Sequence, residues 1–213
     1  CLIKPTGATA QDGNDSRAIG VRPAAAVFEP LAEQAPSGCA GMFVGVNEFT
    51  VDRGLSRLYY AVHDAVETAY LFAFELKLIP PQNCYILISG EPDTRPEAAI
   101  VRQHLEQLRK SGATITNAQR STILTTFLKA KSVGREQSDL FVCSFSSHGF
   151  NQGPSAFIMP SDGSRQLLAE TAVPLASIER NMGDDELGSK AGHRLLLVDA
   201  CQERVSARGS TSA

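Results

Sequence analysis

Short apolar runs alternate with longer amphipathic stretches along most of the chain. The apolar runs have the length and composition of buried parallel strands, and they lie at 42–46, 84–88, 139–145 and 195–198. Apolar residues spaced by three and four predict a helix from Leu58 to Leu76, and helices are also expected at about 96–110, 118–131 and 173–182. Strands that alternate with helices predict an α/β fold with a mainly parallel sheet covered on both faces, a three-layer αβα arrangement.

The first part of the chain lacks this pattern. Residues 1–40 are rich in Gly, Ala, Pro, Gln and Asp without a sustained period, so we expect a flexible N-terminal segment or linker there. The folded domain is expected over residues 41–213. The chain starts with Cys1 rather than Met, which indicates a fragment, a processed form or a trimmed sequence; a lipidated N-terminal cysteine is the alternative.

Composition and charge narrow the class of protein. With 213 residues, 43% of them hydrophobic, the chain is large enough for one sizeable α/β domain. Its net charge of −3 provides no electrostatic reason to expect nucleic acid or an anionic membrane as a partner, and no apolar run approaches the roughly 20 residues that span a bilayer. The five cysteines, at positions 1, 39, 84, 143 and 201, match no metal-ligand spacing and predict reduced thiols in a cytoplasmic protein.

Two predicted strands end in residues that can carry chemistry. His148 follows the strand at 139–145, and Cys201 follows the strand at 195–198. Singly, such a cysteine is usually a small core residue and such a histidine a surface group. If the two strands are neighbours, however, the pair meets at the carboxyl ends of the sheet, where an imidazole can hold the thiol as the nucleophilic thiolate. Gly149 would let the backbone approach a substrate and offer an N–H to an oxyanion.

Four stretches of the sequence carry a family resemblance, in the order in which they occur. They are Phe43–Asn47, Leu58 to Asp64-Ala65, Phe145–Gly149 and Leu196–Cys201, and together they span about residues 41–202. With them the chain resembles the caspase, metacaspase and bacterial caspase-like cysteine peptidases, and most closely the bacterial and metacaspase types. The resemblance implies a caspase-like catalytic domain over 41–213 and a cysteine endopeptidase that acts on protein or peptide substrates.

The same resemblance implies a role for each residue of the pair. Cys201 is expected to be the nucleophile, and His148 the general base and then the general acid for the leaving amine. The backbone N–H groups of Gly149 and Cys201 are expected to line the oxyanion hole. No carboxylate is evident to orient the imidazole, and a backbone carbonyl is an alternative that the sequence does not show.

An acidic specificity pocket is a further implication. True caspases carry Gln two residues before the nucleophile, where this chain carries Asp199. In metacaspases and their bacterial relatives this Asp and an Asp of the first helix line the pocket; the matching residue is Asp64, and Ser146 matches the pocket wall. Two carboxylates predict cleavage after Arg or Lys. Alternatively, Asp64 satisfies N–H groups at a helix start and Asp199 accepts a hydrogen bond at a strand end.

The sequence does not support calcium activation, which part of the family shows. Calcium-dependent metacaspases have a dense acidic loop after the histidine, whereas the stretch 150–165 contains only Asp162. The acidic cluster Asp184-Asp185-Glu186 is more often a solvated turn than a metal site. We therefore expect no cofactor and no metal.

The chain continues for only 12 residues past Cys201, whereas the family fold continues through further strands. We therefore expect the large-subunit portion of a peptidase, a fold incomplete at its C-terminus, and a small-subunit segment as partner. Arg204 and Arg208 are expected self-cleavage sites if the pocket selects Arg; an arbitrary sequence end is the alternative. A sheet edge exposed in this way would make the chain poorly stable or sticky unless it is paired.

Two other functions compete with an Arg/Lys-directed endopeptidase. One is a caspase-like interaction or scaffold module that no longer cleaves, although degenerate relatives usually lose the His or the Cys and this chain has both. The other is a flavodoxin-like or nucleotide-binding domain. The chain lacks a G-x-G-x-x-G or Walker-type loop after its first strand, which argues against the latter.

Overall fold

A five-stranded parallel sheet forms the centre of the molecule. The computed structural model describes residues 35–92, 98–183, 188–200 and 202–204. Within them the main sheet has the strand order β3-β2-β1-β4-β8, and every neighbouring pair is parallel. The strands are β1 (Ala40–Val46), β2 (Cys84–Ser89), β3 (Thr114–Asn117), β4 (Leu140–Ser146) and β8 (His193–Asp199).

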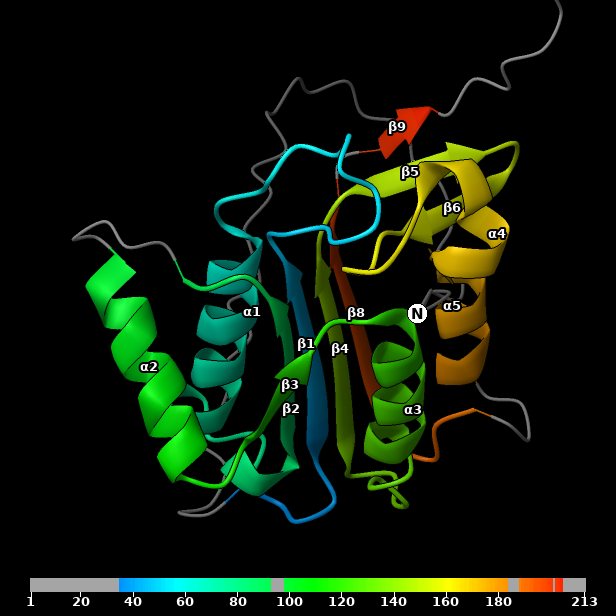
Figure 1. Cartoon of the computed structure of the whole chain (residues 1–213). Helices are drawn as coiled ribbons and strands as arrows, with labels where there is room; N and C mark the ends of the chain where they lie inside the picture. The colour runs from blue at the N-terminus through cyan, green and yellow to red at the C-terminus, as the bar shows by residue number, and fades with distance from the viewer. Residues whose placement is uncertain (1–34, 93–97, 184–187, 201, 205–213) are drawn as a thin grey trace, which may run out of the picture.

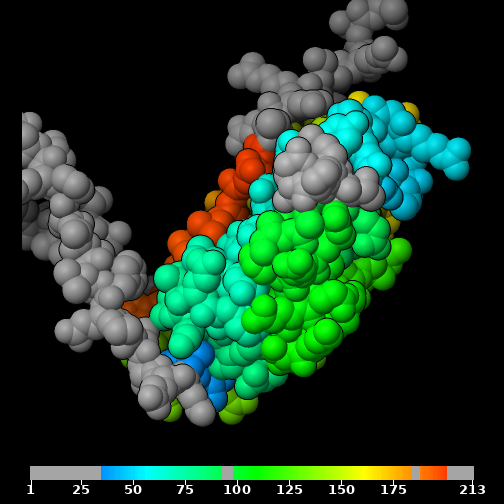
Figure 2. All heavy atoms as spheres, turned by 90° about the vertical axis from the view of Figure 1, so that its left-hand side faces the viewer, coloured from blue at the N-terminus to red at the C-terminus, as the bar shows by residue number. Residues whose placement is uncertain are grey.

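Helices cover both faces of this sheet (Figure 1). On one face lie α1 (Ala61–Tyr70) and α2 (Ala99–Lys110), and on the other lie α3 (Arg120–Lys131) and α5 (Leu175–Met182). Figure 2, which views the molecule from the first of these faces, shows α2 in green as the outermost layer beside α1 in teal. The predicted three-layer αβα fold with a mainly parallel sheet is confirmed.

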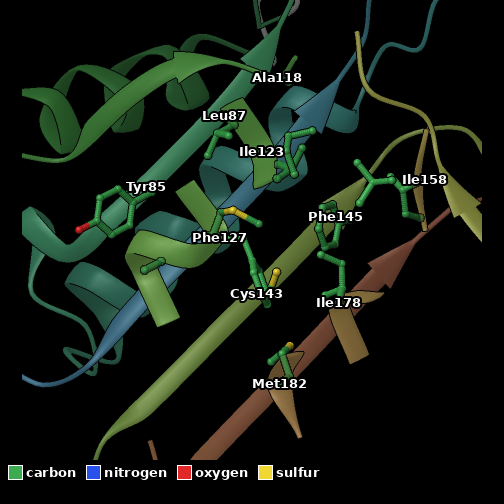
Figure 3. Packing of buried hydrophobic residues seen from close by; sticks show 14 of the residues in the cluster. Tyr85, Leu87, Ala118, Ile123, Phe127, Cys143, Phe145, Ile158, Ile178 and Met182 are labelled. Atoms are coloured by element: carbon green, nitrogen blue, oxygen red, sulfur yellow. The ribbon is translucent and has the colours of Figure 1, made fainter. Parts of the chain in front are cut away.

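Strand β1 shows why these strands are continuous apolar runs. Met42, Val44 and Val46 belong to the core cluster on one face of the sheet, and Phe43 to the cluster on the opposite face. Successive residues of a strand point to opposite faces, so a strand covered on both sides must be apolar at every position. Figure 3 shows the first cluster, in which Phe127 of α3 and Ile178 and Met182 of α5 pack over Cys143 and Phe145 of β4.

A smaller, four-stranded sheet lies beyond the carboxyl ends of the main strands (Figure 1). Its strand order is β7-β6-β5-β9, with β5–β6 and β6–β7 antiparallel and β5–β9 parallel. The strands are β5 (Gly149–Gln152), β6 (Ser155–Ile158), β7 (Val173–Pro174) and β9 (Gln202–Arg204). Between β6 and β7 lie a 3-10 turn, η4 (Arg165–Leu167), and α4 (Leu168–Thr171).

Most of the predicted elements are present, but the first helix has different bounds and several short strands are additional. The helix predicted from Leu58 begins only at Ala61, and Leu58 belongs to the preceding loop, where its N–H donates to the carbonyl of Asn47. Its last part, η1 (Leu71–Glu75), is a π-helical turn, and a 3-10 turn, η2 (Pro81–Asn83), leads into β2. Strand β3 was not predicted, because it is a short, polar strand at the sheet edge with partly exposed residues throughout.

Strand β8 forms the other edge of the main sheet. It pairs with β4 and, among the described residues, with no further strand. Leu195, Leu197 and Val198 are 37%, 36% and 41% exposed, and the orange-red atoms of this strand run along one margin of Figure 2. Among the described residues, β8 is therefore an edge strand with partly exposed apolar side chains. That a small-subunit segment covers it stays a prediction, and the predicted linker over 1–40 lies almost wholly outside the described residues.

Gly45 sets how closely α1 approaches β1, so we expect Gly45→Ala to lower the free energy of unfolding by about 1–3 kcal/mol. A Cβ atom at this position would lie 2.3 Å from the Ala61 carbonyl oxygen at the start of α1. Chemical denaturation measures the loss. Gly183→Ala is the matched control, because its Cβ would come no closer than 3.2 Å to any atom. Equal losses in the two variants would contradict the steric explanation.

Candidate active site

The register of β4 and β8 brings the two predicted catalytic segments together. Ser146 at the end of β4 pairs with Asp199 at the end of β8, and the Ser147 N–H donates to the Asp199 carbonyl over 3.2 Å. Three residues further along the chain from each of these positions, Gly149 of β5 pairs with Gln202 of β9 in the small sheet. In the sequence, His148 and Cys201 each lie between these paired positions. Cys201 itself is outside the described residues.

The His148 imidazole is held in one orientation by a backbone carbonyl. Its side chain is 5% exposed, and Nε2 lies 2.9 Å from the Ser56 carbonyl oxygen and 3.4 Å from the Ser56 hydroxyl. Because a carbonyl can only accept, Nε2 carries the proton and Nδ1 is left as the basic nitrogen of the neutral ring. The rings of Phe49 and Phe150, at centroid distances of 5.1 and 6.2 Å, pack around the imidazole. Ser56 thus takes the orienting role for which the sequence shows no carboxylate.

Residues 47–60 form the loop that carries Ser56, and Asn47 at its start fixes it with two hydrogen bonds. This residue is 1% exposed; its carbonyl accepts from the Leu58 N–H over 2.9 Å, and its Oδ1 accepts from the Val62 N–H over 3.2 Å. The second bond satisfies a free N–H in the first turn of α1. Through its backbone carbonyl and its side chain, Asn47 therefore connects the end of β1, the Ser56 loop and the start of the helix that carries Asp64.

A bidentate ion pair holds the same loop near its middle. The two carboxylate oxygens of Asp52 accept from Arg165 Nε and from its terminal nitrogen over 2.9 and 3.0 Å, and Asp52 also accepts from the Arg165 backbone N–H over 3.0 Å. Hydrogen bonds from this guanidinium lower the pKa of Asp52 from 3.8 to about 2. The ion pair links the Ser56 loop to the segment between β6 and β7 of the small sheet.

We expect Asp52→Asn to lower the free energy of unfolding at pH 7 by about 1–2 kcal/mol. Because the folded-state pKa of Asp52 lies below the ordinary value, its contribution is present above pH 3.8 and is lost as the pH falls through about 2. Denaturant unfolding at pH 7 and pH 2 measures both effects. The difference between wild type and variant should shrink toward zero at pH 2; a constant difference would contradict this account.

A pocket of about 340 Å³ opens next to His148. The predicted site residues Asp64, Ser146, His148 and Asp199 all line it, and its other lining residues are Arg57, Leu58, Tyr59, Tyr60, Ala61 and Ser147. The Ser146 hydroxyl donates to Asp64 Oδ2 over 2.8 Å. This bond joins the end of β4 to α1. The structure therefore places these four residues around one space large enough for a side chain.

The pocket is acidic, and its two carboxylates interact. Asp64 is half-buried, and Asp199 is exposed. Burial raises the pKa of Asp64, the Ser146 hydrogen bond opposes this rise, the negative charge of Asp199 adds to it, and His63 lowers the pKa slightly. Two carboxylates that repel one another in this way are stabilised by a cation placed between them. Asp64 also lies in the first turn of α1, as the helix-start alternative expects.

Two other hollows on the described surface have similar volumes but different chemistry. One, of about 350 Å³, is lined by Ala35, Ala73, Phe74, Lys77, Pro80, Pro81 and Gln82. The other, of about 400 Å³, is lined by Lys131, Ser132, Gly134, Arg135, Gly188 and Lys190. Neither lining contains a carboxylate, an imidazole or a thiol, so the acidic pocket beside His148 is the better candidate for chemistry.

Three of the five cysteines are buried and poorly suited to nucleophilic attack. Cys39, Cys84 and Cys143 are free thiols with at most 3% exposure. Burial raises the pKa of all three, that of Cys84 to about 12. Figure 3 shows Cys143 enclosed by the apolar side chains of the core. Because the thiolate is the reactive form, these three cysteines are inert at neutral pH, which leaves Cys1 and Cys201 as candidates.

The remaining predicted site residues have separate positions. Gly149 begins β5 and lies directly after His148, and Arg204 ends β9. Cys201, Arg208 and the acidic cluster Asp184–Glu186 lie outside the described residues. Within the part of the chain that the structure describes, no group of three or more His, Cys, Asp or Glu side chains could hold a metal ion.

In the same part of the chain, the structure contains no helix with the length and apolar character needed to cross a membrane. The sequence matches no model of a known protein family, and it has no significant match among curated proteins.

Proposed function

We propose that the chain is a cysteine endopeptidase that uses His148 and Cys201 and cleaves peptide bonds after Arg or Lys. The observation that carries the proposal is the pairing of Ser146 with Asp199 and of Gly149 with Gln202. It aligns the histidine segment with the cysteine segment beside an acidic pocket. The caspase-like motifs of the sequence support the same assignment.

The reaction would begin with a proton transfer between the two catalytic side chains. Nδ1 of His148 takes the proton of the Cys201 thiol, and the thiolate attacks the carbonyl carbon of the peptide bond that follows the basic residue. The Ser56 carbonyl keeps the proton on Nε2 and stabilises the imidazolium that forms. Nδ1 then returns its proton to the leaving amine, and the C–N bond breaks.

Backbone N–H groups would stabilise the oxyanion of this step. Those of Gly149 and Cys201 are the proposed donors. The thioester left on Cys201 is then hydrolysed: Nδ1 removes a proton from water, the hydroxide attacks the thioester carbonyl, and the thiol leaves with the proton that Nδ1 returns. The enzyme is regenerated with the same protonation of His148.

The acidic pocket accounts for the proposed specificity. Asp64 and Asp199 would bind the cationic side chain of the substrate, and an Arg guanidinium can make paired hydrogen bonds to a carboxylate. Ala61 at the start of α1 also lines the pocket; it is 2% exposed, and its side chain is small.

Fluorogenic peptides that differ only in the residue before the reporter group, Arg, Lys or Asp, test the proposed function. We expect turnover of the Arg and Lys peptides, none of the Asp peptide, and complete loss in Cys201→Ala. Preferential cleavage after Asp would refute the acidic-pocket assignment. Absence of all turnover would favour the non-cleaving scaffold.

A further inference from the structure

Two exposed tyrosines stand at the mouth of the acidic pocket. Tyr59 and Tyr60 are 58% and 57% exposed, and both line the pocket. Large aromatic side chains that remain accessible beside a polar pocket are typical of ligand-binding surfaces, because they offer a rigid contact area at low entropic cost. Neither tyrosine takes part in the proposed proton transfers or in the binding of the substrate cation by the two carboxylates.

Tyr60 lies on the same side of α1 as the carboxylate of Asp64. It is the N-cap residue of the helix, and its carbonyl accepts from the Asp64 N–H over 2.9 Å. Residues four apart in a helical turn have neighbouring side chains. The ring of Tyr60 packs edge-on against His63, with the centroids 5.7 Å apart and the planes at 83°. Because Tyr60 and Asp64 also line the same pocket, a cation bound to Asp64 would be close to the Tyr60 ring.

We propose that Tyr60 is a specificity-determining residue whose ring packs against the guanidinium group held by Asp64 and Asp199, so that the pocket selects Arg over Lys. This inference rests on the proposed function and assigns one residue to its substrate preference. A guanidinium is planar and weakly hydrated, so it gains both stacking and cation–π energy on an aromatic face. A lysine ammonium is compact and strongly hydrated, and it gains less from such a wall.

Tyr59 is a matched control for this role. It is as exposed as Tyr60 and lines the same pocket, but the guanidinium of Arg57 lies 5.9 Å above its ring centroid. Arg57 is also paired with Glu48 over 3.1 Å. A second cation would be repelled at this ring, so Tyr59 should contribute little to the binding of a basic side chain.

Binding of acetyl-arginine amide and acetyl-lysine amide to the Cys201→Ala protein tests the inference without catalysis. We expect Tyr60→Leu to raise the Kd of the arginine ligand about three- to ten-fold, from the cation–π energies of partly exposed sites. The Kd of the lysine ligand should change less than about two-fold, so that the preference for arginine falls. Tyr60→Phe keeps the ring and should bind as wild type does, and Tyr59→Leu should raise the Kd of the arginine ligand less than Tyr60→Leu does.

Three outcomes would overturn the inference. One is an unchanged arginine Kd in Tyr60→Leu, and another is an equal loss for both ligands. The third is a loss in Tyr60→Phe as large as that in Tyr60→Leu, which would assign the effect to the hydroxyl. Asp64→Asn in the same titration separates this inference from the proposed function. If Asp64→Asn weakens arginine binding and Tyr60→Leu does not, only the role of Tyr60 fails; if the parent binds neither ligand, both proposals fail.

Discussion

His148→Ala should lower kcat for an Arg peptide by about 10³-fold, the range found when a general acid–base group is removed. The structure provides the reason: the Ser56 carbonyl fixes Nε2 as the protonated nitrogen, so the imidazole presents one basic nitrogen for both proton transfers. Because the ring is nearly buried between Phe49 and Phe150, water cannot readily replace it. Steady-state kinetics measures the effect.

His193→Ala is the matched control, since His193 is an exposed histidine at the far end of the neighbouring strand β8. It should keep wild-type kcat. If His148→Ala retains a tenth of the wild-type rate while its thermal unfolding is unchanged, His148 is not the general base.

Asp64→Asn should lower kcat/KM for the Arg peptide roughly 30- to 100-fold, because one charged partner of a half-buried ion pair is lost. Asp199→Asn should act in the same direction but less strongly, since Asp199 is exposed. The double variant should lose less than the sum of the two free energies, because both carboxylates would bind one cation. Kinetics with Arg and Lys peptides measures these losses.

Glu67→Gln is the control for Asp64, because Glu67 lies on the same helix but pairs with His104 over 2.8 Å instead of lining the pocket. The pH dependence offers a second check. The folded-state pKa of Asp64 is raised above 3.8. As the pH is lowered, Asp64 should therefore lose its charge, and the pocket its affinity for a basic side chain, at a higher pH than with an ordinary Asp. A midpoint of this loss at or below pH 3.8 would contradict the conclusion that burial raises the pKa of Asp64.

The main sheet could be predicted from the sequence because its strands are apolar on both faces. The runs that became β1, β2 and β4 are largely buried between two helical layers. β8 has the same apolar pattern, although Leu195, Leu197 and Val198 are partly exposed at the sheet edge. β3 and the four strands of the small sheet were not predicted, because they have two to four residues each and lack the long apolar runs of a central strand. Short strands depend on tertiary pairing rather than on local pattern.

In the candidate site, the residues that follow a strand could be placed from the sequence, whereas the contacts between residues far apart in the sequence could not. His148 and Asp199 follow apolar strands, so their position at the carboxyl ends of the sheet follows from the fold class. The approach of Ser56 to His148 spans 92 positions in the sequence and uses a backbone carbonyl, which leaves no mark in the residue types. The Asp64–Ser146 hydrogen bond spans 82 positions; the family resemblance assigned both residues to one pocket but did not predict their contact.

The central claim is that Cys201 is a thiolate nucleophile activated by His148 beside a pocket for a basic side chain. Alkylation with a peptidyl-arginine chloromethyl ketone tests it directly, since the thiolate displaces chloride and leaves a stable C–S bond that mass spectrometry can locate. The account predicts one adduct, on Cys201, formed much more slowly in His148→Ala and in Asp64→Asn and with an aspartyl analogue. Equal labelling of several cysteines, or equal rates with the arginyl and aspartyl reagents, would contradict it.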